Sequence, residues 1–284
     1  MRRRGELRMI FRGVYVRRGF EDSLRTRVEA AALILGPDQV VCDRAAAFLH
    51  GVDVYGSRES QARPMETCVL RGGTRTRHAG IDGRSRDLAQ GEIETRGGIR
   101  LTTPLRTALD LGCALPRHRA LGTMDELARR HGLDRAALEW ASGRFRGRRG
   151  VVQLRSLVPL VDSRAESPRE SWIRLEIGDA GLPRPELQWW VVQDGVALWR
   201  LDLAYPDHKV AVEYDGEEFH RRTEAQIAHD AERRRWLRHH GWRVIVVTKT
   251  DLRQGADAAW LEQLRDALAS KTSRFRWELG RPHK

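Results

Sequence analysis

Two apolar segments near the C-terminus, residues 197–205 and 209–214, are separated by little more than a Pro-Asp turn. Such short spacing between β-type segments favours an antiparallel hairpin with no helix between its strands. A long helical pattern at 223–239 follows, and then an apolar run at 242–248 with the character of a central strand. These patterns predict a mixed sheet flanked by helices in the C-terminal region.

The same region begins with a helix signal. In Ser167-Pro-Arg-Glu170, the serine is expected to cap the helix and the glutamate to reach back to the cap. A helix to residue 180, a strand at 186–192 and a last helix at about 256–269 complete the order α-β-β-β-α-β-α. We therefore expect a folded C-terminal domain over 165–270.

Acidic residues interrupt the apolar strands. Asp202 lies in the first strand of the hairpin, Glu213 in the second, and Asp215 just beyond it. Because side chains alternate along a strand, the hairpin is expected to bring these carboxylates together on one face. Converging carboxylates repel one another unless a cation lies among them, and Mg²⁺ prefers oxygen ligands. We therefore predict an Mg²⁺ or Mn²⁺ site formed by Asp202, Glu213 and Asp215. The alternative is that these acids are solvated on an exposed sheet face.

The composition favours a polyanionic partner. The 284 residues are enough for two domains and carry a net charge of +12, which favours nucleic acid as that partner. Only four of the 51 basic residues are lysine, and such an arginine excess is also typical of a GC-rich coding sequence. Charge by itself is therefore weak support for nucleic-acid binding.

The cysteines and the hydropathy pattern indicate a cytoplasmic protein. Cys42, Cys68 and Cys113 show neither metal-ligand spacing nor an even number, so reduced thiols are expected. No apolar stretch has the length of a membrane span, and the arginine-rich start lacks the apolar core of a signal peptide.

The N-terminal half is expected to form a mixed α/β domain over residues 1–160, opening with a hairpin at 7–17. A basic loop, Arg144–Arg149, precedes the domain boundary near 160–166. Further elements are expected as helices at 23–35, 43–49, from 103, 117–131 and 134–142, and as short strands at 66–71, 75–78, 92–95 and 98–101.

The C-terminal pattern resembles the PD-(D/E)xK nuclease superfamily. More narrowly, it is similar to the Vsr endonucleases of very-short-patch repair and to an uncharacterised family of bacterial domains related to them. The matching stretches cover most of 165–255 and are Ser167–Glu170, Leu201–Tyr205, Val212–His220, Asp230 with Arg233 and Arg234, and Gly241–Val247 with Asp251-Leu252. The resemblance implies a restriction-endonuclease-like sheet flanked by helices.

Carried over by position, the resemblance implies that Asp202 is the principal metal ligand and Glu213 a direct ligand. His220 matches the histidine that activates the attacking water, so His220 would act as a general base. Asp215 stands where the wider superfamily has lysine and Vsr enzymes have histidine. That exchange removes a positive charge useful in the transition state, so the site either needs a second metal or no longer cleaves.

Two outer acids complete the implied site. Glu170 and Asp230 match acids that hold water or orient the histidine. Each also has a structural interpretation: Glu170 as a helix-capping residue, and Asp230 as a helix-surface partner for Arg233 or Arg234.

A second resemblance covers the N-terminal half. Residues 3–16, Asp43–Gly51 and Leu101–Asp110 are similar to AbiEi-type antitoxins of type IV toxin–antitoxin systems. The resemblance implies a partial winged helix, with residues 7–17 as its wing, and a possible cognate toxin. In this family the helix-turn-helix lies upstream of the wing, and the chain begins almost at the wing. We therefore expect that element either to belong to an earlier start or to be lost.

Arginines near the wing and in the C-terminal helix are the candidates for contact with nucleic-acid phosphates, which would position the protein without reading sequence. They are Arg2, Arg3, Arg4, Arg8, Arg12, Arg233 and Arg234.

Two functions follow from these patterns. The leading hypothesis is an Mg²⁺-dependent DNA endonuclease linked to toxin–antitoxin systems, phage defence or repair. The alternative is a non-catalytic, DNA-binding, antitoxin-like regulator with a degenerate nuclease fold. Cleavage of RNA is left open, because no residue pattern reads a 2′-hydroxyl.

Overall fold

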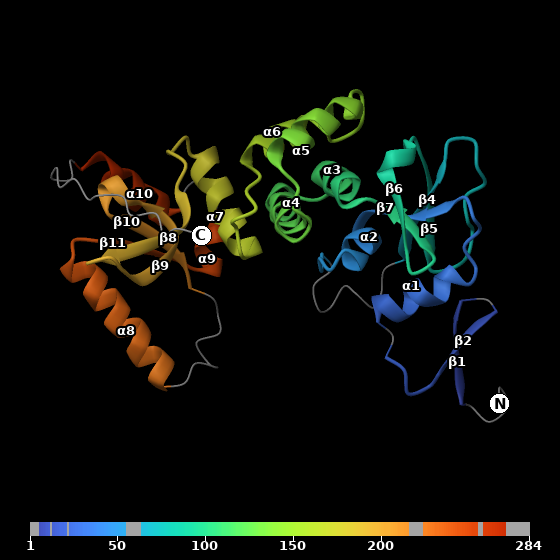
Figure 1. Ribbon diagram of the computed structural model, residues 1–284, viewed down its shortest axis with the longest axis horizontal. Helices are drawn as coiled ribbons and strands as arrows, with labels where there is room; N and C mark the ends of the chain where they lie inside the picture. The colour runs from blue at the N-terminus through green and yellow to red at the C-terminus, as the bar shows by residue number, and fades with distance from the viewer. Residues whose placement is uncertain are drawn as a thin grey trace. The chain divides into compact units, whose positions relative to one another are not determined.

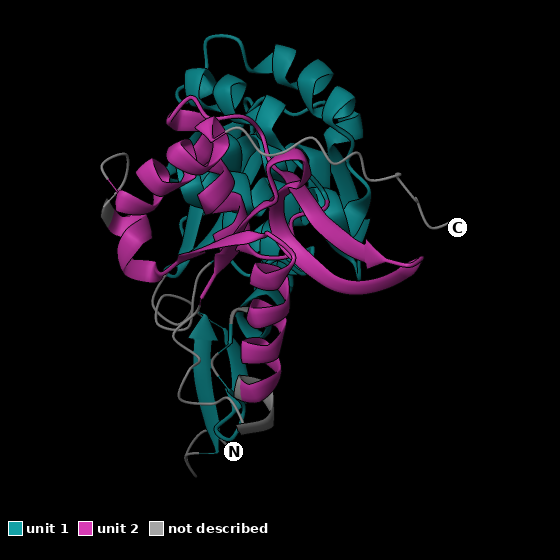
Figure 2. Ribbon diagram, turned by 90° about the vertical axis from the view of Figure 1, so that its left-hand side faces the viewer, with its two compact units in different colours: residues 1–163 teal, residues 164–284 magenta. Residues whose placement is uncertain are grey.

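The computed structural model describes residues 6–11, 13–21, 23–54, 64–215, 224–254 and 258–270. The chain divides into two compact units, residues 1–163 and 164–284 (Figures 1 and 2). Each unit combines helices with a β-sheet, which confirms the expected mixed α and β class. In the described parts of the chain, no helix has both the length and the apolar character needed to cross a lipid bilayer.

Unit 1 opens with the β-hairpin that the sequence predicts. Its strands are β1 (Leu7–Phe11) and β2 (Val14–Arg17), paired antiparallel with a bulge between Met9 and Phe11. Phe11 and Val14 are buried in a core cluster with residues of the helices and strands that follow. The hairpin is therefore held to unit 1 by apolar packing.

The remaining helices and strands of unit 1 are α1 (Leu24–Ala32), β3 (Gln39–Val41), α2 (Asp43–Leu49), β4 (Met65–Leu70), β5 (Ile81–Arg86), β6 (Ile93–Arg96), β7 (Ile99–Thr102), α3 (Pro104–Ala114), α4 (Arg117–His131), α5 (Arg135–Ser142) and α6 (Val151–Leu157). Short 3₁₀ helices are η2 (Gln90–Glu92), η3 (Gly143–Phe145) and η4 (Val158–Leu160). Figure 1 shows α3 to α6 gathered into a helical layer.

The sheet of unit 1 has the strand order β5-β4-β3-β7-β6, in which β4 pairs parallel with β5 and β3 pairs parallel with β7. The strand predicted at 75–78 is wrong; the edge strand is β5, with the sequence Ile-Asp-Gly-Arg-Ser-Arg. Ile81 is the one apolar residue of this strand, so its sequence shows no alternation of apolar and polar residues. It is also the one residue of the strand that is buried. An edge strand of this kind carries little of the pattern by which strands are recognised.

In α2 and α3, side-chain oxygens accept backbone N–H groups of the first helical turn. The helix predicted from residue 103 is α3: a threonine followed by proline is a typical helix start, and here Thr103 accepts the Arg106 N–H while Pro104 occupies the first turn. The aspartate at the start of α2 would be a typical capping residue, but the side chain of Glu66 on β4 accepts the Ala45 N–H instead, at 3.1 Å. A carboxylate distant in sequence therefore satisfies the start of α2 and leaves Asp43 for other contacts.

The described part of unit 2 follows the predicted order α-β-β-β-α-β-α, with two short helices added, the 3₁₀ helix η5 and the α-helix α9. Its elements are α7 (Pro168–Asp179), β8 (Glu186–Gln193), β9 (Val196–Tyr205), η5 (Pro206–His208), β10 (Val210–Tyr214), α8 (Glu224–His239), β11 (Arg243–Val247), α9 (Lys249–Gln254) and α10 (Ala259–Ala269). The sheet order is β11-β10-β9-β8, with β10 and β11 parallel and the other neighbours antiparallel.

Helices pack on both faces of this sheet. Leu203 and Val212 lie in a core cluster with residues of α7 and α10, whereas Leu201 and Ala211 pack with Leu237 of α8. Leu201 and Leu203 therefore lie on opposite faces, so the predicted alternation along β9 is wrong at this point.

Gln188 on β8 has a backbone φ of +53° and drops out of the ladder opposite Asp202, between the pairs Leu187–Leu203 and Trp189–Leu201. A positive φ is uncommon for a residue other than glycine, and it interrupts the pleat. The interruption falls beside the acidic residue of β9, so the strand is distorted where the acidic cluster is built.

Ser167 caps α7 as predicted, because its Oγ accepts the Glu170 N–H at 3.2 Å. Ser167→Ala is expected to lower the free energy of unfolding by about 1 kcal/mol, since this N–H then loses its partner. Ser156→Ala is the control: its exposed hydroxyl bonds the Gln153 carbonyl and caps no helix, so a change under about 0.5 kcal/mol is expected. Urea unfolding measures both, and equal losses would contradict the capping role.

Candidate functional site

The hairpin of β9 and β10 brings predicted site residues together. The ladder pairs Val212 with Leu203, which places Glu213 and Asp202 at the next position on adjacent strands. Burial, followed by the negative charges of Glu170 and Glu213, raises the pKa of Asp202 to about 6. The structure therefore gathers Glu170, Asp202 and Glu213 into an acidic cluster within unit 2.

Two arginines of α8 form ion pairs with carboxylates at the end of β10. Arg233 pairs with the buried Glu213 at 2.6 Å, and Arg234 pairs with Asp215 at 3.3 Å. The Asp215 N–H also donates to the Val247 carbonyl, which continues the pairing of β10 with β11. The positive charge that the carboxylates require is thus supplied by the protein itself.

The remaining predicted catalytic residues lie in different settings. Glu170 is buried, and its carboxylate accepts the Glu166 N–H at 3.0 Å and the Gln188 side-chain amide at 2.9 Å. Asp230 lies on α8, one turn before Arg233. His220 lies outside the described residues. The catalytic roles of these residues stay predictions.

The predicted metal ion is not tested directly by the described side chains. No group of three His, Cys, Asp or Glu side chains with an arrangement suited to a metal occurs within the described ranges. Arg233 occupies an oxygen of Glu213 that a cation would need, and a guanidinium and Mg²⁺ compete for the same lone pairs. Binding of Mg²⁺ or Mn²⁺ by Asp202, Glu213 and Asp215 therefore stays a prediction.

The predicted phosphate-binding arginines are mostly engaged or outside the described residues. Arg8 on β1 donates to the Phe20 carbonyl at 3.4 Å, and Arg233 and Arg234 are held by carboxylates. The arginines at positions 2, 3, 4 and 12 lie outside the described residues.

Unit 1 contains a second cluster of charged side chains, for which the sequence predicted no role. Asp110 on α3 contacts the guanidinium groups of three arginines: Arg86 on β5, Arg106 one turn earlier on α3, and Arg148 in the basic loop. Arg86 also reaches Asp43 at the start of α2. We call Asp43, Arg86, Arg106, Asp110 and Arg148 the arginine–aspartate network.

The network is buried, and its charges compensate one another. The side chain of Arg106 is 1% exposed and that of Asp110 is 5% exposed. Burial would lower the pKa of Arg86, but the neighbouring Cys42, Asp110 and Asp43 raise it above its ordinary value. Arg86 therefore stays charged, and the network joins β5, α2, α3 and the basic loop.

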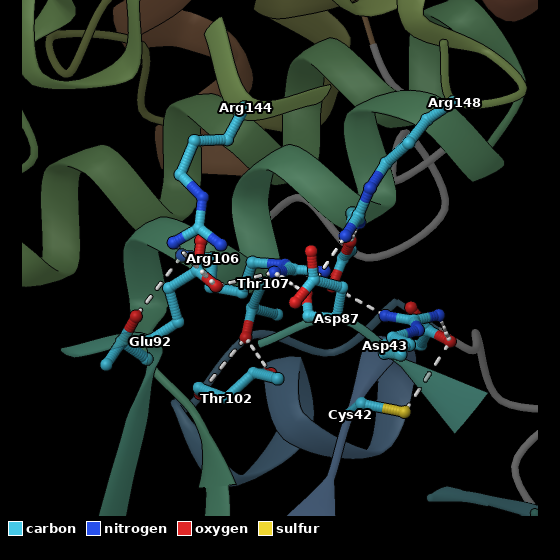
Figure 3. Close-up of polar contacts among 12 residues, drawn as sticks. Cys42, Asp43, Asp87, Glu92, Thr102, Arg106, Thr107, Arg144 and Arg148 are labelled. Atoms are coloured by element: carbon cyan, nitrogen blue, oxygen red, sulfur yellow. Dashed lines mark hydrogen bonds and ion pairs between the residues drawn. The ribbon is translucent and has the colours of Figure 1, made fainter. Parts of the chain in front are cut away.

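The basic loop closes over this network. Arg148 donates to the Asp87 carbonyl at 3.0 Å, and Arg144 lies 3.6 Å from Glu92, which also pairs with Arg106 at 2.8 Å. Figure 3 shows the side chains of Arg144 and Arg148 extending toward these partners. One signal in the sequence was available: Arg106 and Asp110 stand at i and i+4 spacing within the otherwise apolar α3.

Comparison with known proteins agrees with the N-terminal resemblance. Residues 39–160 match the family model described as the AbiEi antitoxin C-terminal domain. That range includes the sheet from β3 onward, the helices α2 to α6 and the arginine–aspartate network. No solved structure matches the chain significantly.

Two curated proteins of Mycobacterium tuberculosis, the uncharacterized proteins MT2308 and Rv2248, are similar to this chain. Each is 34% identical over 251 residues, which is 88% of this chain and 88% of the relative.

These matches overturn the leading functional hypothesis. The expectation of an Mg²⁺-dependent DNA endonuclease is wrong, because the matched family is one of antitoxins and the relatives carry no nuclease assignment. The ion pairs of Arg233 and Arg234 give the physical reason why clustered acids misled the sequence analysis, since these acids have protein cations as partners. The chain belongs to the same family as the two mycobacterial proteins, with an AbiEi-type antitoxin domain over residues 39–160.

Proposed function

We propose that this protein is a DNA-binding regulator of the antitoxin type, which acts without catalysis. The match of residues 39–160 to the AbiEi antitoxin domain is the observation that carries the proposal. The net charge of +12 also supports a polyanionic ligand, since arginines that neutralise phosphates release counterions and make binding favourable.

The acidic cluster of unit 2 has a structural role in this proposal. Glu213 pairs with Arg233, and Glu170 accepts two hydrogen bonds, so both buried carboxylates are satisfied by the protein. These contacts connect the sheet to α7 and α8. The cluster then stabilises the arrangement of unit 2 and need not react with DNA.

Binding without cleavage is the expected result of a direct test. The full chain is titrated onto a fluorescent duplex taken from the region upstream of its own coding sequence, while supercoiled plasmid is incubated with it in Mg²⁺ or Mn²⁺. Binding should weaken steeply with salt, and the plasmid should stay intact. Asp202→Ala should bind as tightly as the native chain. Metal-dependent nicking that disappears in Asp202→Ala would contradict the proposal, as would the absence of any DNA binding.

The family also supports a protein partner. An antitoxin neutralises a toxin, so we propose that a toxin encoded beside this chain is its second ligand. The neighbouring reading frame is expressed alone and together with the chain. Growth arrest that the chain relieves supports this partner, and arrest that persists in its presence contradicts it.

A further inference from the structure

We propose that the basic loop Arg144–Arg149 is a rigid phosphate-binding surface that grips the backbone of duplex DNA through Arg146 and Arg149. The inference rests on the proposed DNA-binding function and assigns part of that function to unit 1. The loop has the sequence Arg-Phe-Arg-Gly-Arg-Arg, in which four of six residues are arginine.

The loop is fixed from inside by Phe145 and Arg148. Phe145 is 1% exposed and lies under two guanidinium groups, with Arg148 4.4 Å and Arg106 5.0 Å from its ring centroid. Arg148 is bound to Asp110 and to the Asp87 carbonyl. The inner side chains of the loop are thus bound to the network shown in Figure 3.

The backbone of the loop is equally constrained. Gly147 and Gly150 have φ values of +77° and +82°, which side-chain-bearing residues rarely adopt. A Cβ at Gly150 would lie 2.2 Å from the carbonyl oxygen of Cys113 on α3. The chain therefore lies directly against α3 at Gly150, the residue that follows the loop, and only glycine fits at that position.

The outer side chains of the loop have no counter-charge. Arg146 and Arg149 are exposed, and within the described part of the chain neither makes a hydrogen bond or an ion pair. Two other exposed arginines of unit 1 differ in this respect, because Arg129 pairs with Glu126 and Arg135 pairs with Glu139. Because the backbone of the loop is already fixed, an anion bound by these two guanidinium groups orders their side chains but little of the backbone.

The exposed part of the loop favours nucleic acid over a protein partner. Its one apolar residue, Phe145, is buried, so the loop offers cationic groups and glycine to the solvent. The centres of protein–protein interfaces are depleted in charge, whereas protein–DNA interfaces are polar and strongly positive. Arginines in this setting contact phosphates and position the protein without reading bases.

The salt dependence of DNA binding tests the inference. Anisotropy titrations use the full chain and a labelled mixed-sequence duplex of about 30 base pairs, from about 50 to about 200 mM NaCl. Arg146→Ala with Arg149→Ala should reduce the slope of log K against log[salt] by about 1.8, since each phosphate contact contributes about 0.9. The double lysine variant at these positions should restore the slope, because lysine keeps the charge. Thermal melting of each variant verifies that the exposed substitutions leave the fold intact.

The matched control is Arg129→Ala with Arg135→Ala, which removes the same charge from paired positions of unit 1 and should leave the slope unchanged. An equal loss of slope in both pairs would show a net-charge effect and overturn the inference. A native slope in the loop variant would also overturn it, and loss of toxin capture in that variant would then mark the loop as a protein interface. If the native chain fails to bind duplex DNA, the proposed function fails and this inference fails with it.

Discussion

Asp110→Ala is expected to lower the stability of unit 1 by about 3–5 kcal/mol, which is typical when one partner of a buried ion network is removed. Asp110 accepts from Arg86, Arg106 and Arg148, and the first two of these are 15% and 1% exposed. Without the carboxylate, these guanidinium groups stay buried with insufficient negative charge. Hydrogen exchange of the amides in β5 and α3 measures the change in the free energy of opening.

Asp82→Ala is the control for this prediction. Asp82 also pairs with an arginine on β5, but it and Arg84 are 40% and 48% exposed. An exposed pair contributes about 0–1 kcal/mol, so this variant should change opening by no more than that. Similar effects for the two substitutions would show that the arginine–aspartate network does not stabilise unit 1 through its buried charges.

Asp202→Asn is expected to stabilise unit 2 by about 2 kcal/mol at pH 7.5. Burial and the charges of Glu170 and Glu213 raise the pKa of Asp202 to about 6, so the folded state binds this proton more tightly than the unfolded state does. The native chain therefore loses stability as the pH rises from about 4 to about 6, and the loss is complete above that range. Asparagine removes this cost because it carries no charge.

The measurement is urea unfolding followed by tryptophan fluorescence between pH 4 and pH 7.5, because eight of the nine tryptophans lie in unit 2. The difference between Asp202→Asn and the native chain should be small near pH 4 and grow to its full value above pH 6. Asp207→Asn is the control, because Asp207 is exposed in η5, the turn between β9 and β10. It should change the free energy of unfolding by no more than about 0.5 kcal/mol over the whole pH range. A difference that does not vary with pH would contradict the raised pKa.

The acidic cluster shows how local patterns can predict an arrangement and mislead about its purpose. The short turn between the two strands correctly placed Asp202 beside Glu213, because the register of a hairpin is set within a few residues. The positive charge that balances Glu213 comes from Arg233, which lies 20 residues further along the chain on helix α8. No spacing rule relates residues on separate elements in this way, so the counter-charge was visible only in the fold.

The network in unit 1 shows the same limit more strongly. Asp43, Arg86 and Asp110 meet although they are separated by 43 and 24 positions. The apolar residues of α3 fit its burial, but nothing in their spacing indicates a partner for the charged residues Arg106 and Asp110 on the same helix. The sequence also failed to predict β5, because its mostly polar residues show no apolar alternation. The charge of Arg86 on this strand is instead compensated by Asp43 and Asp110 on other elements.

The sequence by itself determined the mixed α and β class, the order of elements in unit 2, the caps of α3 and α7, and the similarity of the N-terminal half to antitoxins. These features depend on interactions over one to a few turns or on contiguous motifs. Only the tertiary structure decided which charges are satisfied and which are free. It paired Arg233 and Arg234 with acids, buried Arg106 and left Arg146 and Arg149 exposed. The physical reason is that ion pairing depends on distance in space, and packing sets that distance between residues far apart in the chain.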